Sequence, residues 1–246
     1  MNLELYRESM DYRNNLLFAL PIEWNGLKVY PLKLKEIINY SFEKYNKFIS
    51  IITLNKTEIM DSLSILEEVS LWDFIILNFV SVDNDEVKDL FLHIFSLIFK
   101  DKVVFSVEGV FLIGDTGKTI DESNYTEIFS ILKDQNCAKE REEKYLNKRE
   151  REYQKAVQLA KQKYKKALKA MGKEDTDLLD IISSICAKHP SLNFFNIQEL
   201  TIYQMIDQFK RLNMIDDYFV SIDSLLAGAN KKDVNLIHWS KKYEQN

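Results

Sequence analysis

Hydrophobic residues recur at helical spacing along most of this chain, with polar residues between them. Such stretches are found over residues 33–52, 60–79 and 85–99. A further helix, capped by Ser123 or Asn124, is expected to run through Leu132. The 85–99 stretch has so many apolar positions that we expect its helix to be largely buried. These positions are Val87, Leu90, Phe91, Ile94, Phe95 and Ile98.

Two other stretches carry the alternation and turn residues of small β-hairpins. The first lies within residues 17–33, where Asn25-Gly26 supplies the positive φ angles of a type I′ turn and Pro31 ends the second strand. The second is expected over residues 102–120, with a turn at Glu108-Gly109. The predicted fold class is therefore mainly α, with one or two small β-hairpins.

The last third of the chain predicts a pair of helices. Asp175 and Thr176 are suitable N-caps for the first, which must end before Pro190. Its apolar stripe consists of Leu178, Leu179, Ile181, Ile182 and Ile185. Asn196 is the expected cap of the second helix, and Gly228 with Asn230 supplies its stop. Its apolar positions are Leu200, Tyr203, Met205, Ile206, Phe209, Leu212, Met214 and Ile215.

A long charged helix is predicted between these regions, because residues 138–171 contain no Pro and no Gly. Gly172 ends it. The expected organisation is an N-terminal α+β lobe (1–137), a long basic connecting helix (138–172) and a C-terminal helical module (173–246).

Composition narrows the classes of protein to consider. A net charge of −5 gives no overall attraction to nucleic acid or anionic lipid. The start of the chain is too charged for a secretory signal, and the most apolar window, Leu71–Val80, is too short to span a bilayer. Cys137 and Cys186 lie far apart and are expected to be reduced thiols of an intracellular protein.

The segment Gly114–Thr119 shares the last three positions of a phosphate-binding P-loop. A full loop has a glycine five residues before Gly117, where this chain has Leu112, and a helix that begins at Lys118. Here Asp121-Glu122 would instead place two carboxylates near the phosphate. We therefore expect a hairpin turn that uses glycines for positive φ, in preference to a nucleotide site.

Other chemical signatures are lacking in the sequence. His93, His189 and His238 form no pair with metal-ligand spacing, although His189 could face the negative end of a helix dipole. No nucleophile elbow is present, and carboxylates at helix ends are explained by capping. The sequence thus predicts no catalytic residues, no metal site and no cofactor, which favours a protein that is not an enzyme.

The lysine-rich end of the charged helix has three possible explanations. Its lysines are Lys155, Lys161, Lys163, Lys165, Lys166, Lys169 and Lys173. They could form a solvated face that complements the helix dipole, or bind nucleic acid, although only Tyr164 is available to stack on bases. Alternatively, Lys161, Lys165 and Lys169 could line a docking surface for a partner helix. Of these, the solvated helix is favoured, then partner docking.

Several segments together resemble a known family. They are "LLDIISSI", "LTIYQMIDQFKRL", "AGAN" and the closing "IHW", with "LPIEWNGLKVYPLKLKEI" near the start and "EIFSILKDQNC" in the middle. Their order is similar to that in small proteins encoded among the tail genes of tailed phages of Gram-positive hosts. Those proteins are generally assigned as tail or baseplate assembly chaperones.

This resemblance implies a non-enzymatic assembly factor that binds a tail or baseplate component in the host cell cytoplasm. The implied client is a tape-measure protein or a baseplate hub protein. In the C-terminal module, we expect the anchors of an apolar groove to be Tyr203, Ile206, Phe209 and Leu212, with Trp239 as a lid. Ordinary core packing is the alternative for each of them. The alternative function is a structural subunit retained in the tail or baseplate of the virion.

Overall fold

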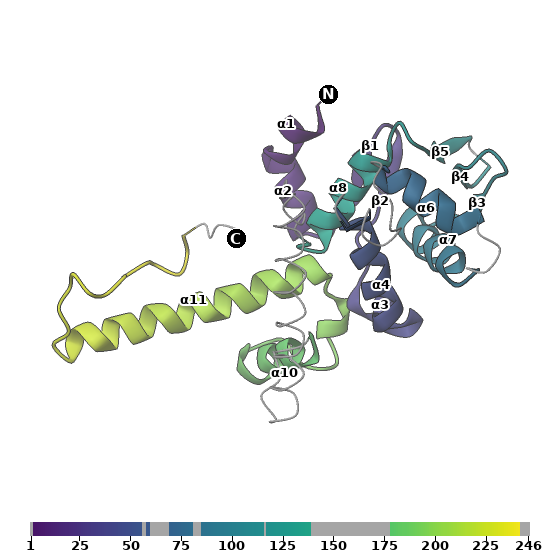
Figure 1. Ribbon diagram of the computed structural model, residues 1–246. Coiled ribbons are helices and arrows are strands. Elements are labelled where there is room, and N and C mark those ends of the chain that lie inside the picture. Colours follow the sequence, from purple (N-terminus) through teal and green to yellow (C-terminus); the bar gives the residue numbers. More distant parts are fainter. Residues whose placement is uncertain are drawn as a thin grey trace, which may run out of the picture.

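The computed structural model describes residues 2–55, 58–59, 69–80, 85–115, 117–138 and 178–241. In these residues the protein is mainly α-helical, with a two-stranded and a three-stranded antiparallel sheet (Figure 1). The predicted fold class is confirmed. Across the described ranges, no helix is both long enough and apolar enough to span a membrane.

Two short helices begin the chain. Asn2 caps α1 (Leu3–Arg7), and Ser9 caps α2 (Met10–Leu17) through a side-chain oxygen that accepts a hydrogen bond from the Tyr12 amide at 3.1 Å. Tyr12 and Leu16 are buried, so α2 packs against the core through the side that carries them.

The first hairpin has the predicted geometry. Strands β1 (Ile22–Trp24) and β2 (Leu27–Val29) pair with Trp24 opposite Leu27. Asn25 and Gly26 have φ angles of 48° and 76°, as a type I′ turn requires. The alternate residues of both strands are buried, so one face of the hairpin lies on the core.

The stretch predicted to be helical over residues 33–52 is helical, but the structure divides it into two helices at Ser41. Helices α3 (Leu34–Tyr40) and α4 (Phe42–Ile52) meet where Ser41 has a φ of 150°. The Ser41 hydroxyl accepts a hydrogen bond from the amide of Lys44 and so caps a new helix instead of continuing the first.

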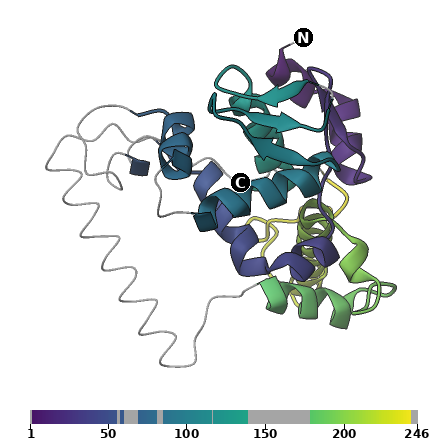
Figure 2. The same cartoon turned by 90° about the vertical axis from the view of Figure 1, so that its right-hand side faces the viewer.

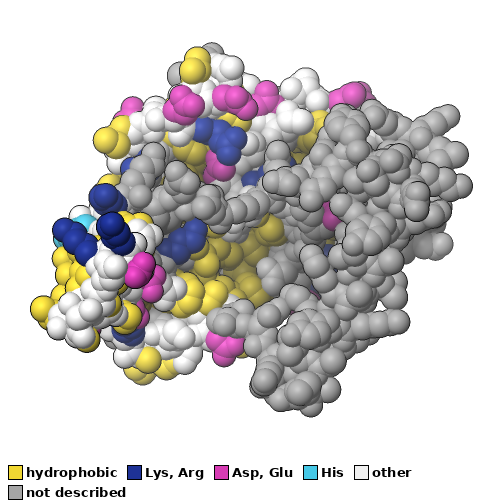
Figure 3. All heavy atoms as spheres, turned by 60° about the vertical axis from the view of Figure 1, so that its left-hand side comes forward, with side chains coloured by type: hydrophobic (Ala, Val, Ile, Leu, Met, Phe, Trp, Pro, Cys, Tyr) yellow, Lys and Arg dark blue, Asp and Glu magenta, His cyan; other side chains and the backbone are white. Residues whose placement is uncertain are grey.

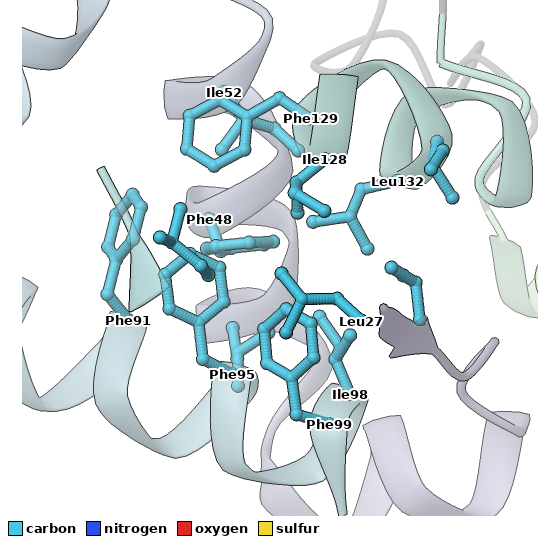
Figure 4. Packing of buried hydrophobic residues seen from close by; sticks show 14 of the residues in the cluster. Leu27, Phe48, Ile52, Phe91, Phe95, Ile98, Phe99, Ile128, Phe129 and Leu132 are labelled. Atoms are coloured by element: carbon cyan, nitrogen blue, oxygen red, sulfur yellow. The ribbon is translucent and has the colours of Figure 1, made fainter. Parts of the chain in front are cut away.

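The main core forms around α7. This helix spans Asp85–Phe99, as predicted. Before it, α6 (Leu71–Val80) begins after Ser70, whose hydroxyl accepts a hydrogen bond from the amide of Asp73, so the helix expected over residues 60–79 is interrupted at residues 69–70. The aromatic rings of α7 interlock with those of neighbouring elements (Figure 4). The ring centroids of Phe48 and Phe91 lie 4.9 Å apart, as do those of Phe95 and Phe111. These edge-to-face contacts hold α4 and α7 against a sheet.

That sheet contains three strands where the sequence predicted a hairpin. Strands β3 (Val103–Phe105), β4 (Phe111–Ile113) and β5 (Lys118–Ile120) are antiparallel in the order β3-β4-β5. Helix α8 (Tyr125–Gln135) follows. It begins after Asn124, although the side chain of Asn124 makes no capping hydrogen bond.

The C-terminal part contains the predicted helix pair with two differences. Helix α10 (Leu178–Lys188) buries Ile182 and Ile185, but Leu179 of the predicted stripe is 65% exposed. Asn196 precedes a short 3₁₀ turn, η1 (Ile197–Glu199), and is not the cap of the long helix α11 (Ile202–Leu226). Thr201 is the cap, in a reciprocal capping box with Gln204. The predicted stop is confirmed, because α11 ends just before Gly228, whose φ is 96°.

The two parts of the chain share their hydrophobic cores. Tyr203 of α11 lies in the main core, whereas Leu34 of α3 lies in a second core formed with Ile182, Ile185, Ile197 and Met205. At the same boundary Lys33 and Thr201 form a β-bridge, and the side-chain Nε2 of Gln204 donates to the carbonyl of Leu17 at 2.9 Å. Figure 2 shows α10 beneath the helices α3 and α4.

Several predictions lie outside the described residues. They are the long helix over 138–172, except for Ala138, the caps Asp175 and Thr176, and the candidate docking lysines Lys161, Lys165 and Lys169.

Candidate protein-binding surface

The predicted groove residues are divided between two places. Tyr203 is 7% exposed and packs in the main core. Ile206, Phe209 and Leu212 are half-buried and pack against the second core, on the side of α11 that meets α10. The structure therefore does not place these four side chains in one exposed row, and their predicted role in binding stays a prediction.

Trp239 belongs to a C-terminal tail, residues 229–241, that turns back along α11 (Figure 1). The Arg211 guanidinium donates hydrogen bonds to the carbonyls of Trp239 and Lys241, at 3.0 and 2.8 Å. The ring of His238 lies 5.2 Å from that of Tyr218 and stacks on Trp239. Trp239 is thus held at the face of α11 that carries Arg211 and Tyr218, while Ile206, Phe209 and Leu212 point toward the second core.

Apolar side chains are exposed on the part of α11 beyond α10 and on the tail. Phe219, Val220 and Leu226 of the helix are 57%, 63% and 81% exposed. Leu236 and Ile237 of the tail are also exposed. In Figure 3 the left-hand side of Figure 1, with the end of α11 and the tail, comes forward, and hydrophobic side chains lie on this part of the surface. Clustered exposure of this kind is typical of a protein-binding surface.

A second exposed apolar feature lies in the connection between α10 and α11. Phe194 and Phe195 are 65% and 88% exposed. They follow no helical period, so the hydrophobic pattern did not reveal them. The available signal was two adjacent phenylalanines within the polar, Pro-containing stretch "HPSLNFFN".

Ion pairs lie at both ends of this connection, at Lys188 and at Glu199. Glu199 accepts hydrogen bonds from Lys33 and Lys35 at 2.9 and 2.7 Å, and Lys188 pairs with Asp216. The hydrogen bonds from the two lysines hold the pKa of Glu199 below its usual range, and the same contact raises the pKa of Lys33.

The P-loop-like segment forms a turn between strands. Gly114 and Gly117 have φ angles of 56° and 68°, and Lys118 begins β5 where a phosphate-binding loop would begin a helix. The Lys118 ammonium donates to the carbonyl of Gly26 in the first hairpin. The glycine-turn interpretation is confirmed.

The histidines and cysteines make structural contacts. The Nδ1 atom of His189 accepts hydrogen bonds from the amides of Ser191 and Leu192, directly after the end of α10. His93 stacks on Tyr40 at 4.0 Å. Burial raises the pKa of the Cys137 thiol to about 11. Within the described ranges, no three His, Cys, Asp or Glu side chains gather as metal ligands would.

Comparison with protein families gives a match to the part of the chain that carries these exposed surfaces. Residues 165–244 match the family model of the YomV second domain. The matched segment is about a third of the chain and includes α10, η1, α11 and the tail. This YomV family is derived from a Bacillus phage, which suggests a phage protein. No curated protein and no solved structure gives a significant match.

Proposed function

We propose that the protein is a non-enzymatic phage assembly factor that binds a tail or baseplate component during virion morphogenesis. The observation that carries the proposal is the exposed apolar surface of α11 and its tail, within the segment that matches the YomV second domain. An exposed apolar surface of this kind, in a segment similar to a phage-derived family, is suited to protein binding.

In the proposed mechanism, a client protein buries an apolar helix or strand against this surface. Phe219 and Val220 are adjacent in α11, and Leu226 follows within two turns, so their side chains cover a length of helix that a client segment can contact. Occupation of the client's apolar segment would prevent its premature association. The proposed clients are a tape-measure protein and a baseplate hub protein.

The first test is an affinity pull-down of the tagged protein from cells that express the tail-gene cluster, with mass spectrometry of purified phage particles. The expected result is recovery of a tail or baseplate subunit, with this chain missing from the particles. Its presence in particles at fixed copy number would instead assign it as a structural subunit. Recovery of no tail protein in either experiment would contradict the proposal.

A matched pair of variants tests the surface itself. The double substitution Phe219→Ser/Val220→Ser should weaken client binding about tenfold or more, because it removes two exposed apolar contacts. The control Leu5→Ser/Met10→Ser removes two apolar side chains of similar exposure, 68% and 72%, from the N-terminal helices. Equal loss of binding in both variants would argue against a specific role for α11.

A further inference from the structure

The C-terminal tail returns along one side of α11 and contacts it at two points (Figure 1). At the first, Arg211 donates hydrogen bonds to the carbonyls of Trp239 and Lys241. At the second, the ring of Tyr218 lies 5.2 Å from that of His238. Arg211 and Tyr218 are seven residues apart, which places them on the same side of the helix, two turns from each other. The tail therefore lies over a defined side of α11.

Apolar side chains of α11 continue along this side. Met214 and Ile215 lie between the two contact points, and Ile222 lies one turn beyond them. All three are half-buried. Within the described part of the chain, none of them packs against the main core or the second core. We call Arg211, Met214, Ile215, Tyr218 and Ile222 the α11 stripe, and it is this stripe that the C-terminal tail contacts.

The attachment of the tail to the α11 stripe is weak. Within the described residues, the tail forms turns but no helix or strand, and its hydrogen bonds with Arg211 are exposed to solvent. Leu236, Ile237 and Trp239 are still 43%, 45% and 40% exposed. Each such contact contributes little, because water competes for the hydrogen bonds and the apolar side chains are only partly removed from water. The tail can therefore leave α11 without disturbing either core.

The contacts of the tail also define what could take its place. Arg211 binds main-chain carbonyl groups, which every polypeptide has, so this contact does not depend on the sequence of the bound segment. The tail residues 236–239 are Leu, Ile, His and Trp, a run of aliphatic and aromatic side chains. An extended segment of another protein with a similar run can make the same contacts. The α11 stripe thus fits an extended apolar segment.

We propose that the C-terminal tail is an internal competitor, which covers the α11 stripe until an extended apolar segment of the client displaces it. This inference rests on the proposed function and adds a regulated contact to the exposed side chains of α11 described above. A tethered tail acts at an effective concentration on the order of millimolar, so it excludes segments that bind more weakly than itself. The tail thereby shields the stripe from non-specific association while no client is present.

A peptide of residues 229–241 tests this competition without any client. The labelled peptide is titrated, by fluorescence polarisation, into the wild-type protein and into full-length His238→Ala/Trp239→Ala, whose own tail lacks both rings. We expect the peptide to bind the variant at least about tenfold more tightly, because the tail of the variant leaves the stripe open. Equal affinity for the two proteins, or binding to neither, overturns the proposal.

Two further variants locate the bound peptide. Phe194→Ala/Phe195→Ala removes two exposed rings outside the tail and should keep the peptide affinity of the wild-type protein. Addition of Tyr218→Ala to His238→Ala/Trp239→Ala should weaken peptide binding at least about threefold, because the histidine of the peptide loses its ring partner. All of these residues lie outside both cores, so the urea unfolding midpoint should stay at the wild-type value. Unchanged peptide affinity after Tyr218→Ala overturns the assigned stripe.

Client capture separates this inference from the proposed function. In the pull-down described above, His238→Ala/Trp239→Ala should recover at least about threefold more of the phage tail or baseplate subunit than the wild-type protein. Equal or lower recovery would show that the C-terminal tail does not compete with the client and would overturn the proposal. If neither protein recovers a phage subunit while the peptide binds as expected, the proposed function fails and the covering of the stripe by the C-terminal tail stands.

A second copy of this chain is the alternative occupant of the α11 stripe, because two copies could exchange their tails. Size-exclusion chromatography with light scattering measures this, and we expect the wild-type protein to be monomeric. A dimer that becomes a monomer in His238→Ala/Trp239→Ala would show exchange between copies and would overturn displacement by a client.

Discussion

The backbone amide of Leu34 donates a hydrogen bond of 2.8 Å to the carbonyl of Leu200. This bond joins the start of α3 to the residue before the cap of α11, so two segments far apart in the chain are fixed side by side. The β-bridge between Lys33 and Thr201 lies directly next to it. The N-terminal and C-terminal parts of the protein are therefore connected through backbone pairing as well as through side-chain packing.

Leu34 is expected to contribute strongly to stability. Its side chain is 1% exposed and packs in the second core, so Leu34→Ala should lower the free energy of unfolding by about 2–5 kcal/mol. The control is Ile38→Ala in the same helix, where the side chain is 50% exposed and the loss should stay below about 1 kcal/mol. Urea denaturation measures both, and similar values for the two variants would contradict the assigned packing.

Asp134 links α8 to the first two helices. It accepts two hydrogen bonds from Arg7, at 2.6 and 2.7 Å, and one from the hydroxyl of buried Tyr12, at 2.6 Å. Asp134→Ala should lower the free energy of unfolding by about 2 kcal/mol, because the buried hydroxyl loses its acceptor. The exposed Asp11 of α2 provides the control. An effect of Asp134→Ala no greater than that of Asp11→Ala would show that the link is not stabilising.

Stability should fall in alkaline solution. Burial is the largest cause that raises the pKa of Tyr12, with the charge of Asp134 second, and burial also raises the pKa of Tyr45. Above the ordinary tyrosine pKa of about 10, the unfolded chain releases protons that the folded protein retains, so unfolding becomes more favourable as pH rises. The unfolding midpoint in urea should decrease from pH 9 to pH 11.

The variant Tyr12→Phe/Tyr45→Phe supplies the control for this pH effect. Its stability should be lower at neutral pH, because two hydrogen bonds are lost, but it should decrease less between pH 9 and pH 11. An equal decrease in the variant would assign the alkaline instability to other groups.

The turn between β4 and β5 offers a pair of glycines for comparison. Both have positive φ, but a Cβ at Gly114 would collide with the carboxylate of Asp101, whereas a Cβ at Gly117 meets nothing within 4 Å. Gly117→Ala should cost about 1 kcal/mol from backbone strain, and Gly114→Ala clearly more. Thermal unfolding would show the difference, and the reverse order would contradict the turn geometry.

The tail should depend on Arg211 for its position. Arg211→Ala removes the hydrogen bonds to the carbonyls of Trp239 and Lys241, so amide hydrogen exchange over residues 229–241 should become faster. The fluorescence of Trp239 should shift to longer wavelength, which a comparison with Trp239→Phe isolates from the other two tryptophans. Unchanged exchange in this segment would show that the tail is held by its aromatic contacts alone.

Local signals in the sequence were sufficient for some elements and not for others. Asn25-Gly26 determines its turn through two positive φ angles, and the apolar positions of α7 are numerous enough to define a buried helix. The break at Ser41 escaped detection because apolar residues keep the helical period across it. Helices α1 and α2 were not predicted because their sequences are mainly polar, and β5 has only three residues, Lys118–Ile120.

The candidate site was harder to predict, for a physical reason. Helical spacing identifies the apolar positions of α11, but it does not say which neighbour each side of the helix meets. Tyr203 turns toward the main core and Phe209 toward the second, while Phe219 remains exposed because α11 extends beyond α10. Phe194 and Phe195 lie in an irregular connection, where periodicity carries no information.

The position of Leu34 shows that the second core is not formed by the C-terminal segment alone. Leu34 completes the second core, yet it lies far outside residues 165–244, the segment that matches the YomV second domain. The segment that matches the family model therefore differs in its bounds from the folded unit. Residues 165–244 taken alone would lack the Leu34 side chain, which in this protein fills part of the core around Ile185 and Met205.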